Sequence, residues 1–267
     1  MRHYGEKIYW EKHYKNIESN NTFDWILDYS DVKEIISSLN INKESSKILN
    51  VGCGNSEFSE NMYDDGYHDI QNIDVSQELI NFMKGRAKNR PGLNYELMDV
   101  YNMKFKNNFF DLIIDKSTLD AISCSYDYNI NIAKMLKEIQ RVLKIKGYYM
   151  IISYEEPENR VIHLKRKFLR FKIDVIKIKE NNIKGKKDDF NYVYLCQKLE
   201  DADEYSEKFY EDTIKEFIEQ EEIEDEQDEI YGENTNKDNN NYRNPRSYQC
   251  NDFTEQNKIF ENLTTWK

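Results

Sequence analysis

Two glycines and a carboxylate stand where open α/β sheets bind nucleotide-like ligands. Gly52 and Gly54 directly follow the apolar run at residues 47–51. Glycines two apart at the carboxyl end of a strand let the backbone turn sharply and approach a ligand closely. Asp74 ends the next apolar run, 22 residues after Gly52, where a carboxylate can accept hydrogen bonds from both hydroxyls of a ribose. The spacing therefore predicts a site for a ligand that contains a nucleoside.

The third position of the dinucleotide-binding motif argues against a ligand with phosphates. The motif needs a small residue there for helix packing and for the pyrophosphate, but this chain has Glu57. Because a carboxylate repels phosphate, we expect a nucleoside without phosphates. S-adenosylmethionine fits this description, since it carries adenosine and a cationic sulfonium.

A second carboxylate follows the third candidate strand. Asp99 can accept a hydrogen bond from an adenine amino group while Val100 packs on the ring; the alternative is an aspartate that caps a turn. Asp74 and Asp99 come after consecutive strands, so the two interpretations as ligand-binding residues support each other.

Short β-type runs alternate with longer helical patterns, which is typical of β-α-β units. The predicted strands of these units are residues 47–51, 70–73, 94–97, 110–114 and 148–153, and the predicted helices are residues 32–39, 77–87 and 130–143. Two further runs, 173–178 and 192–196, have no long helical segment between them and are predicted to form an antiparallel pair. We therefore expect an α/β domain over residues 1–199, with a mainly parallel sheet and helices on both faces.

The remaining residues, 200–267, differ in composition from this domain. They contain 21 acidic and 7 basic side chains, so the net charge of -12 belongs to this tail and the body is close to neutral. Residues 206–223 are predicted to form an amphipathic helix, and the Asn-rich residues 231–248 are predicted to be disordered.

Several classes of protein are disfavoured by the composition. No stretch has the roughly 18 consecutive apolar residues of a membrane span, and the first residues lack the apolar core of a signal peptide. The four cysteines lie far apart without a CxxC pair, so no metal site is predicted. We expect a soluble, cytoplasmic protein.

Several motifs together resemble class I S-adenosylmethionine-dependent methyltransferases. They are residues 51–56 (VGCGNS), Asp74, residues 98–100 (MDV) and residues 110–121 (FDLIIDKSTLDA). A narrower resemblance is to the methyltransferase-like branch that contains the elongation factor 1-alpha lysine methyltransferases and the endothelin-converting-enzyme-2-like protein. It rests also on residues 9–14 (YWEKHY), 23–25 (FDW), Gly66-Tyr67, Arg90-Pro91 and 141–144 (RVLK) before Gly147. The resemblance covers roughly residues 4–198.

The resemblance implies a Rossmann-like, seven-stranded sheet whose last strand is antiparallel, and a set of residues that hold S-adenosylmethionine and its product S-adenosylhomocysteine. These residues are Gly52 against the cofactor, Asp74 with Val75 at the ribose, Asp99 with Val100 at the adenine, Lys116 on the cofactor side, and Trp10, Tyr14 and Trp25 from an N-terminal segment, 1–30, that covers the cofactor. Aromatic faces attract a sulfonium as they attract an ammonium, which agrees with this assignment. Two departures leave loop geometry open: Ser117 stands where the family often has glycine, and Ile145-Lys146-Gly147 replaces a Pro-Gly-Gly turn.

The implied reaction is methylation of a protein lysine, with elongation factor 1-alpha as the implied partner. Asp115, Asp120 and Tyr154 are candidates near the substrate mouth, but none is assigned as a base, and Asp115 is equally well explained as a structural cap.

Another protein site, a small molecule and a non-catalytic adaptor remain alternatives. The adaptor would use the segment 158–187, which has 11 basic and three acidic residues and which the acidic tail is predicted to cover. Nucleic acid is an unlikely partner, because the loop after the fourth strand lacks the Pro-Pro motif of adenine methylation.

Overall fold

A seven-stranded sheet forms the centre of the protein, for which a computed structural model describes residues 4–15, 17, 22–179 and 190–234. The strand order is β3-β2-β1-β4-β5-β7-β6. The strands are β1 (Lys47–Val51), β2 (Asp69–Asp74), β3 (Leu93–Leu97), β4 (Phe110–Lys116), β5 (Leu143–Ser153), β6 (Phe171–Lys179) and β7 (Phe190–Lys198). Only β7 is antiparallel to its neighbours, β5 and β6. The predicted Rossmann-like sheet and its antiparallel final pair are therefore confirmed.

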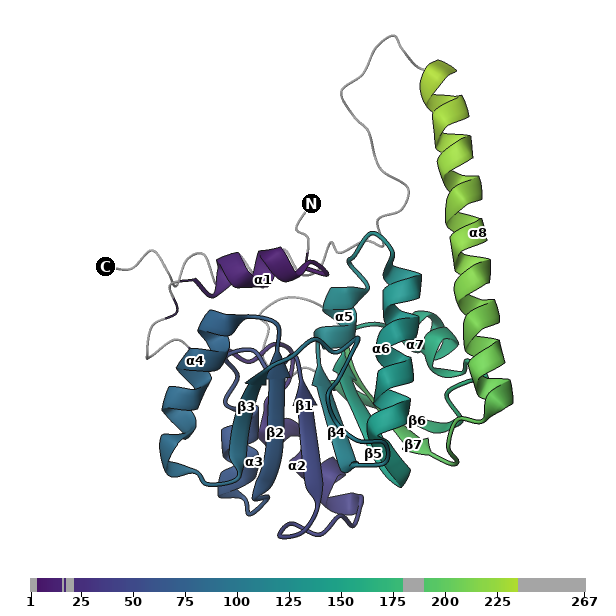
Figure 1. Ribbon diagram of the computed structural model, residues 1–267. Helices are drawn as coiled ribbons and strands as arrows, with labels where there is room; N and C mark the ends of the chain where they lie inside the picture. The colour runs from purple at the N-terminus through teal and green to yellow at the C-terminus, as the bar shows by residue number, and fades with distance from the viewer. Residues whose placement is uncertain (1–3, 16, 18–21, 180–189, 235–267) are drawn as a thin grey trace.

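Helices cover both faces of the sheet (Figure 1). One face packs on α2 (Tyr29–Ser38), α3 (Phe58–Asp64) and α4 (Gln77–Arg86). The other packs on α5 (Thr118–Ile122), α6 (Tyr128–Val142), α7 (Pro157–Leu164) and α8 (Glu204–Asn234). A short α1 (Lys7–His13) lies across one edge of the sheet, and a single 3-10 turn, Ala87–Asn89, precedes β3 (Figure 1).

The central strands are apolar because both of their faces are covered. In β4, Leu112 and Ile114 pack toward α2, whereas Ile113 packs toward α6. In α6 the residues of the predicted apolar stripe, among them Ile132 and Ile139, are fully buried against the sheet. Because short strands alternate with amphipathic helices, β1 to β4 are parallel and their carboxyl ends lie on the same side of the sheet.

The junction between α6 and β5 differs from the prediction. The helix ends at Val142 and β5 begins at once, five residues before the predicted strand start at 148. Lys146 has a positive φ of 66° inside the strand, and the pairing with β4 shifts its register between Phe110 and Leu112. The Lys146-Gly147 pair thus bends a strand and does not end the helix.

Helix α8 begins at Glu204 and continues to Asn234, beyond the predicted range 206–223. Its first half packs Phe209, Ile214 and Phe217 against the core cluster that contains α6. Its second half extends past the body of the protein (Figure 1). Of the segment predicted to be disordered, residues 231–234 are helical and 235–248 lie outside the described residues.

The start of the acidic tail contacts the basic segment, as expected. Arg170 Nη2 lies 3.2 Å from Asp203 Oδ2, and the Arg166 guanidinium lies 4.5 Å from the centre of the Phe217 ring. The division of the chain at residue 199 stays a prediction. Among the described helices, none is both long and apolar enough to cross a membrane.

Candidate active site

A cavity opens at the carboxyl ends of β1 to β4, below α1, which lies across this edge in Figure 1. Its empty volume, open mouth included, is about 1070 Å³. All nine residues that the sequence analysis proposed for the cofactor line it: Trp10, Tyr14, Trp25, Gly52, Asp74, Val75, Asp99, Val100 and Lys116. The fold thus brings together residues from five separate segments.

The glycine turn after β1 is shaped by contact with α5. Gly52 and Gly54 have φ values of 58° and 54°, in the left-handed region that favours glycine. A Cβ on Gly52 would lie 2.1 Å from Thr118 Oγ1. That hydroxyl donates to the carbonyl of Val51 over 2.9 Å. Only glycine at position 52 lets the start of α5 lie this close to the turn.

Asp74 presents a buried carboxylate to the cavity. It is 8% exposed and accepts hydrogen bonds from the backbone N–H groups of Gly54, over 3.2 Å, and Ser76, over 3.0 Å. Burial raises the pKa of Asp74 to about 6, so the group is ionised at neutral pH. A carboxylate has about four acceptor positions, so acceptor capacity remains for a ligand that brings hydroxyl donors.

Asp99 does two things in the structure. Its Oδ1 accepts from Tyr101 N over 2.9 Å, which is the turn that the sequence analysis left open as the alternative. The residue also lines the cavity, beside the buried side chains of Met98 and Val100. This end of the cavity therefore has an apolar wall and an exposed acceptor, which suits a heterocyclic base with an amino group.

Lys116 fastens the N-terminal segment to the end of β4. The buried Lys116 Nζ lies 3.0 Å from Asp24 Oδ1 and donates to the carbonyl of Trp25 over 3.3 Å. Asp24 Oδ1 also accepts from the hydroxyl of Ser56, in the glycine turn. Burial lowers the pKa of Lys116, although Asp24 opposes the shift. Asp24 is thus a positioning residue that the sequence analysis quoted only within a motif.

Aromatic side chains of the N-terminal segment close the cavity from above. The Trp10 ring stacks on Tyr14 at a centroid distance of 5.9 Å and meets Trp25 edge-on at 6.5 Å. Trp10 Nε1 donates to the carbonyl of Tyr4 over 2.6 Å. Tyr14 is buried, and burial raises the pKa of its hydroxyl, which is therefore neutral. These rings give the cavity an electron-rich, uncharged cover.

Asp115 does not lie at the substrate mouth. Its side chain is fully buried, and Oδ1 accepts from the N–H groups of Thr118, over 2.9 Å, and Leu119, over 3.2 Å. Its Oδ2 accepts from the hydroxyl of Tyr149 over 2.6 Å. Asp115 is therefore the structural cap that the sequence analysis gave as the alternative.

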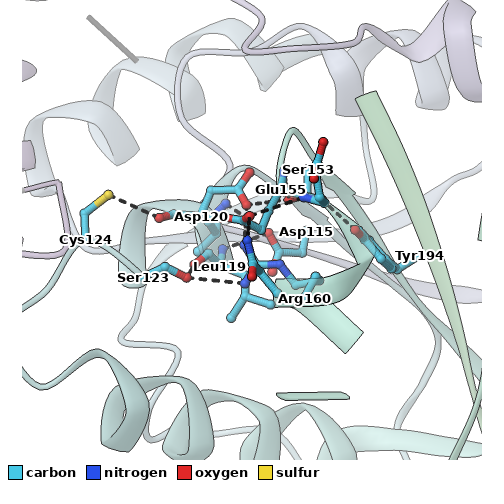
Figure 2. A network of polar contacts seen from close by, with 12 residues as sticks. Asp115, Leu119, Asp120, Ser123, Cys124, Ser153, Glu155, Arg160 and Tyr194 are labelled. Atoms are coloured by element: carbon cyan, nitrogen blue, oxygen red, sulfur yellow. Dashed lines mark hydrogen bonds and ion pairs between the residues drawn. The ribbon is translucent and has the colours of Figure 1, made fainter. Parts of the chain in front are cut away.

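Asp120 does not line the cavity either and belongs to a buried polar network (Figure 2). Asp120 Oδ1 accepts from Arg160 Nη2 and from the hydroxyl of Ser153, each over 2.5 Å. Asp120 and Arg160 are 1% and 2% exposed, so the network holds α5 and α7 together and no substrate reaches it. The third candidate, Tyr154, is half-buried and packs beside Tyr4.

Two other interpretations change with the structure. The Glu57 carboxylate lies 3.0 Å from Arg86 Nη2 and does not line the cavity, so its proposed repulsion of phosphate is wrong. In the basic segment, Arg160 is buried and Arg170 is paired with Asp203, while residues 184–187 lie outside the described residues. Lys165 and Lys167 are exposed, so the described part of this segment keeps positive charge and the adaptor alternative stays a prediction.

The sequence analysis missed several residues that line the cavity. They include Tyr4, Lys7, Phe23, Asn50, Ser56, Ser117 and Thr118. Ser117 and Thr118 directly follow Lys116 at the end of the fourth strand, so position after a strand was a usable signal for these two. Nothing in the sequence alone marks Tyr4 or Asn50. Within the described ranges, no cluster of three or more His, Cys, Asp or Glu side chains is arranged to hold a metal ion.

Comparisons with known proteins agree with this fold and cavity. The family model described as a methyltransferase domain matches residues 42–217. The eEF1A lysine and N-terminal methyltransferase of Bos taurus is 37% identical over 155 residues, which are 57% of this chain and 22% of that protein. The EEF1A lysine methyltransferase 4 of Bos taurus is 27% identical over 168 residues, 60% of this chain and 65% of that protein. The chain therefore matches less than two thirds of the length of either relative.

Solved structures add a likeness in fold alone. The partner of the Trm112 methyltransferase activator in a complex from Haloferax volcanii superposes with a TM-score of 0.52 at 14% identity, over 75% of this chain and 99% of that one. Fold, cavity and relatives together define an S-adenosylmethionine-dependent methyltransferase domain. The chain belongs to the methyltransferase domain family.

Proposed function

We propose that this chain transfers the methyl group of S-adenosylmethionine to a lysine side chain of a protein, and that elongation factor 1-alpha is its substrate. One observation carries the proposal: the buried carboxylate of Asp74 and the aromatic cover of Trp10, Tyr14 and Trp25 belong to one cavity. The names of the two curated relatives, both eEF1A methyltransferases, support the choice of substrate. A cytoplasmic location is part of the proposal.

The lining of the cavity suits each part of the cofactor. Asp74 accepts from the ribose hydroxyls, with Val75 beside it, and Asp99 accepts from the adenine amino group while Val100 packs on the ring. The backbone of Gly52 approaches the cofactor without hindrance. The aromatic cover faces the sulfonium, because aromatic faces attract cations. A nucleoside without phosphates fits a lining that contains two carboxylates.

When bound, S-adenosylmethionine supplies a methyl carbon that its sulfonium already activates for displacement. The protein then has to align the lysine amine, exclude water and keep a lone pair on the nitrogen. A free lysine has a pKa of about 10.4 and is protonated at neutral pH. Desolvation under the aromatic cover lowers that pKa. Asp115 and Asp120 take no part as bases, because they are buried in hydrogen bonds of their own.

A labelled-methyl assay tests this function. Purified chain and S-adenosylmethionine with a tritiated methyl group are incubated with unmodified elongation factor 1-alpha, and the product is digested and mapped by mass spectrometry. The proposal is supported if the methyl group is transferred to a lysine and if this transfer is abolished in Asp74→Ala. Transfer only to the amino terminus or to a small molecule contradicts the lysine assignment. If elongation factor 1-alpha is not methylated but another protein in a lysate is labelled, the named substrate is wrong.

A further inference from the structure

Ser117 has a backbone conformation that its side chain disfavours. Its φ and ψ are 66° and 4°, in the left-handed region. A residue with a Cβ pays roughly 1 kcal/mol or more for this conformation, and such outliers gather at functional sites. Glycine avoids this cost. The presence of serine at this position therefore needs a compensating role.

The hydroxyl of Ser117 has no role inside the described structure. The residue is 7% exposed and lines the cavity. Its backbone N–H donates to Ile152 O over 3.0 Å, but its Oγ has no hydrogen-bond partner among the described residues. A buried polar atom without a partner is costly. A ligand in the cavity is the group that can satisfy this hydroxyl.

Lys116, the preceding residue, brings a positive charge to the same end of the cavity. Asp24 and the Trp25 carbonyl take two of the three donor positions of its ammonium group. One N–H donor of the ammonium has no partner among the described residues, and Lys116 lines the same cavity as Ser117. Two adjacent donors, one of them charged, are suited to a carboxylate.

The strand order says which part of the cofactor reaches this place. The order β3-β2-β1-β4 sets Asp99 and Asp74 at one end and Lys116 and Ser117 at the other. If the nucleoside lies over β3 and β2, the amino-acid portion extends over β1 toward β4. The α-carboxylate is the anionic group of that portion.

We propose that the Ser117 hydroxyl and the Lys116 ammonium bind the α-carboxylate of the methionine portion of S-adenosylmethionine. The inference rests on the proposed use of this cavity for the cofactor. It makes Ser117 a specificity-determining residue, which separates the complete cofactor from analogues without the carboxylate.

Calorimetric titration of three ligands into wild type, Ser117→Gly and Ser117→Ala tests the proposal. The ligands are S-adenosylhomocysteine, decarboxylated S-adenosylmethionine and 5′-methylthioadenosine, of which only the first has the carboxylate. We expect both variants to bind S-adenosylhomocysteine about tenfold more weakly, the loss for one hydrogen bond to a charged group. Affinity for the two ligands without the carboxylate stays as in wild type.

A second substitution controls for the effect that Ser117→Gly has on the backbone alone. Asn40, in the turn after α2, also has a positive φ, of 54°, and does not line the cavity. Asn40→Gly should change no affinity. In the absence of ligand, Ser117→Gly should melt at the same temperature as wild type or higher, because glycine relieves the left-handed conformation. A lower affinity together with an unchanged or higher melting temperature separates a binding role from a structural one.

Two outcomes overturn the inference. If Ser117→Gly binds S-adenosylhomocysteine as tightly as wild type, or loses the same factor for all three ligands, the hydroxyl does not contact the carboxylate, while the proposed function stands. If wild type binds none of the three ligands, the proposed function fails and this inference fails with it.

Discussion

Burial of the Asp74 carboxylate costs stability at neutral pH. The pKa of Asp74 is raised from 3.8 to about 6 by burial, so the folded protein disfavours the ionised carboxylate. The contribution of this group to folding is most favourable below pH 4 and is lost as the pH rises through about 6. The cost is offset only when a ligand donates hydrogen bonds to the carboxylate.

Cofactor affinity should therefore fall in mild acid. We expect the association constant of S-adenosylhomocysteine to be constant above pH 7 and to fall about tenfold per pH unit well below pH 6, as Asp74 becomes protonated. Calorimetric titration between pH 5 and pH 8 measures this slope. In Asp74→Asn the same titration should be flat; a slope that survives in this variant would assign the dependence to another group.

The same substitution should have the opposite effect on stability. Asp74→Asn keeps an acceptor oxygen for only one of the Gly54 and Ser76 N–H groups, which bond to different carboxylate oxygens. It also removes the buried charge, and because this effect is the larger one, the free energy of unfolding at pH 7.5 should rise, by roughly 2 kcal/mol. Urea denaturation without ligand measures this. The gain should shrink toward zero at pH 4, and a loss of stability at pH 7.5 would mean that the carboxylate is needed for folding itself.

The buried pair of Asp120 and Arg160 gives a contrasting case, because each charge depends on the other (Figure 2). Burial raises the pKa of Asp120 while Arg160 opposes the shift. Arg160→Met leaves a buried carboxylate without its cation, and should cost about 3–5 kcal/mol at pH 8. The loss should become smaller as the pH falls, because burial raises the pKa of Asp120 and favours its protonated form. Asp120→Asn combined with Arg160→Met should recover part of the loss.

At the scale of elements, α8 has two halves that differ in what they contact. The first half packs Phe209, Tyr210 and Phe217 on the body, and Glu207 lies 2.7 Å from Lys137. Truncation after residue 199 should expose this apolar surface and lower the unfolding free energy by about 3 kcal/mol or more. Truncation after residue 220 should change it by less than about 0.5 kcal/mol. Equal effects of the two truncations would contradict this division of the helix.

An ion pair between Asp24 and Lys116 helps to fasten the N-terminal segment to the sheet. Asp24→Asn leaves the Lys116 ammonium with a weaker partner, so α1 and its aromatic side chains should be held less firmly over the cavity. We expect faster hydrogen exchange in residues 7–13 and about fivefold weaker binding of S-adenosylhomocysteine. Asp31→Asn, in a helix cap away from the cavity, serves as the control. Unchanged exchange in residues 7–13 would contradict the fastening role.

At the scale of the whole molecule, the sheet and the cavity residues Gly52, Asp74 and Asp99 could be predicted because they follow local rules. The cavity residues Trp10, Tyr14, Trp25 and Lys116 came from the family resemblance. Apolar runs mark strands covered on both faces, and residues that directly follow parallel strands meet at one edge. The direction of side chains in loops follows no such rule. Asp115 and Asp120 lie at the end of β4 and just after it, as predicted, but their side chains are buried in the core. Asp115 accepts a hydrogen bond from the nearby Thr118, and Asp120 accepts one from Arg160, which is distant in sequence.

Long-range packing also explains the misplaced boundaries. The first residues of β5 pair with Phe110 of β4 by a shifted register, which a sequence pattern does not reveal. Helix α8 extends past its amphipathic part, where no apolar stripe marks its course. Ser117 was recognised only as a departure from glycine; its positive φ and its unpartnered hydroxyl become visible in the structure.

Titration calorimetry of S-adenosylmethionine and S-adenosylhomocysteine into wild type and Asp74→Ala is the most direct test of the account, with NADH as the control ligand. The account predicts one molecule bound per chain in the micromolar range, a loss of at least about 100-fold in Asp74→Ala with an unchanged circular dichroism spectrum, and no binding of NADH. Absence of binding to wild type, or equal affinity in Asp74→Ala, would contradict the assignment of this cavity to the cofactor.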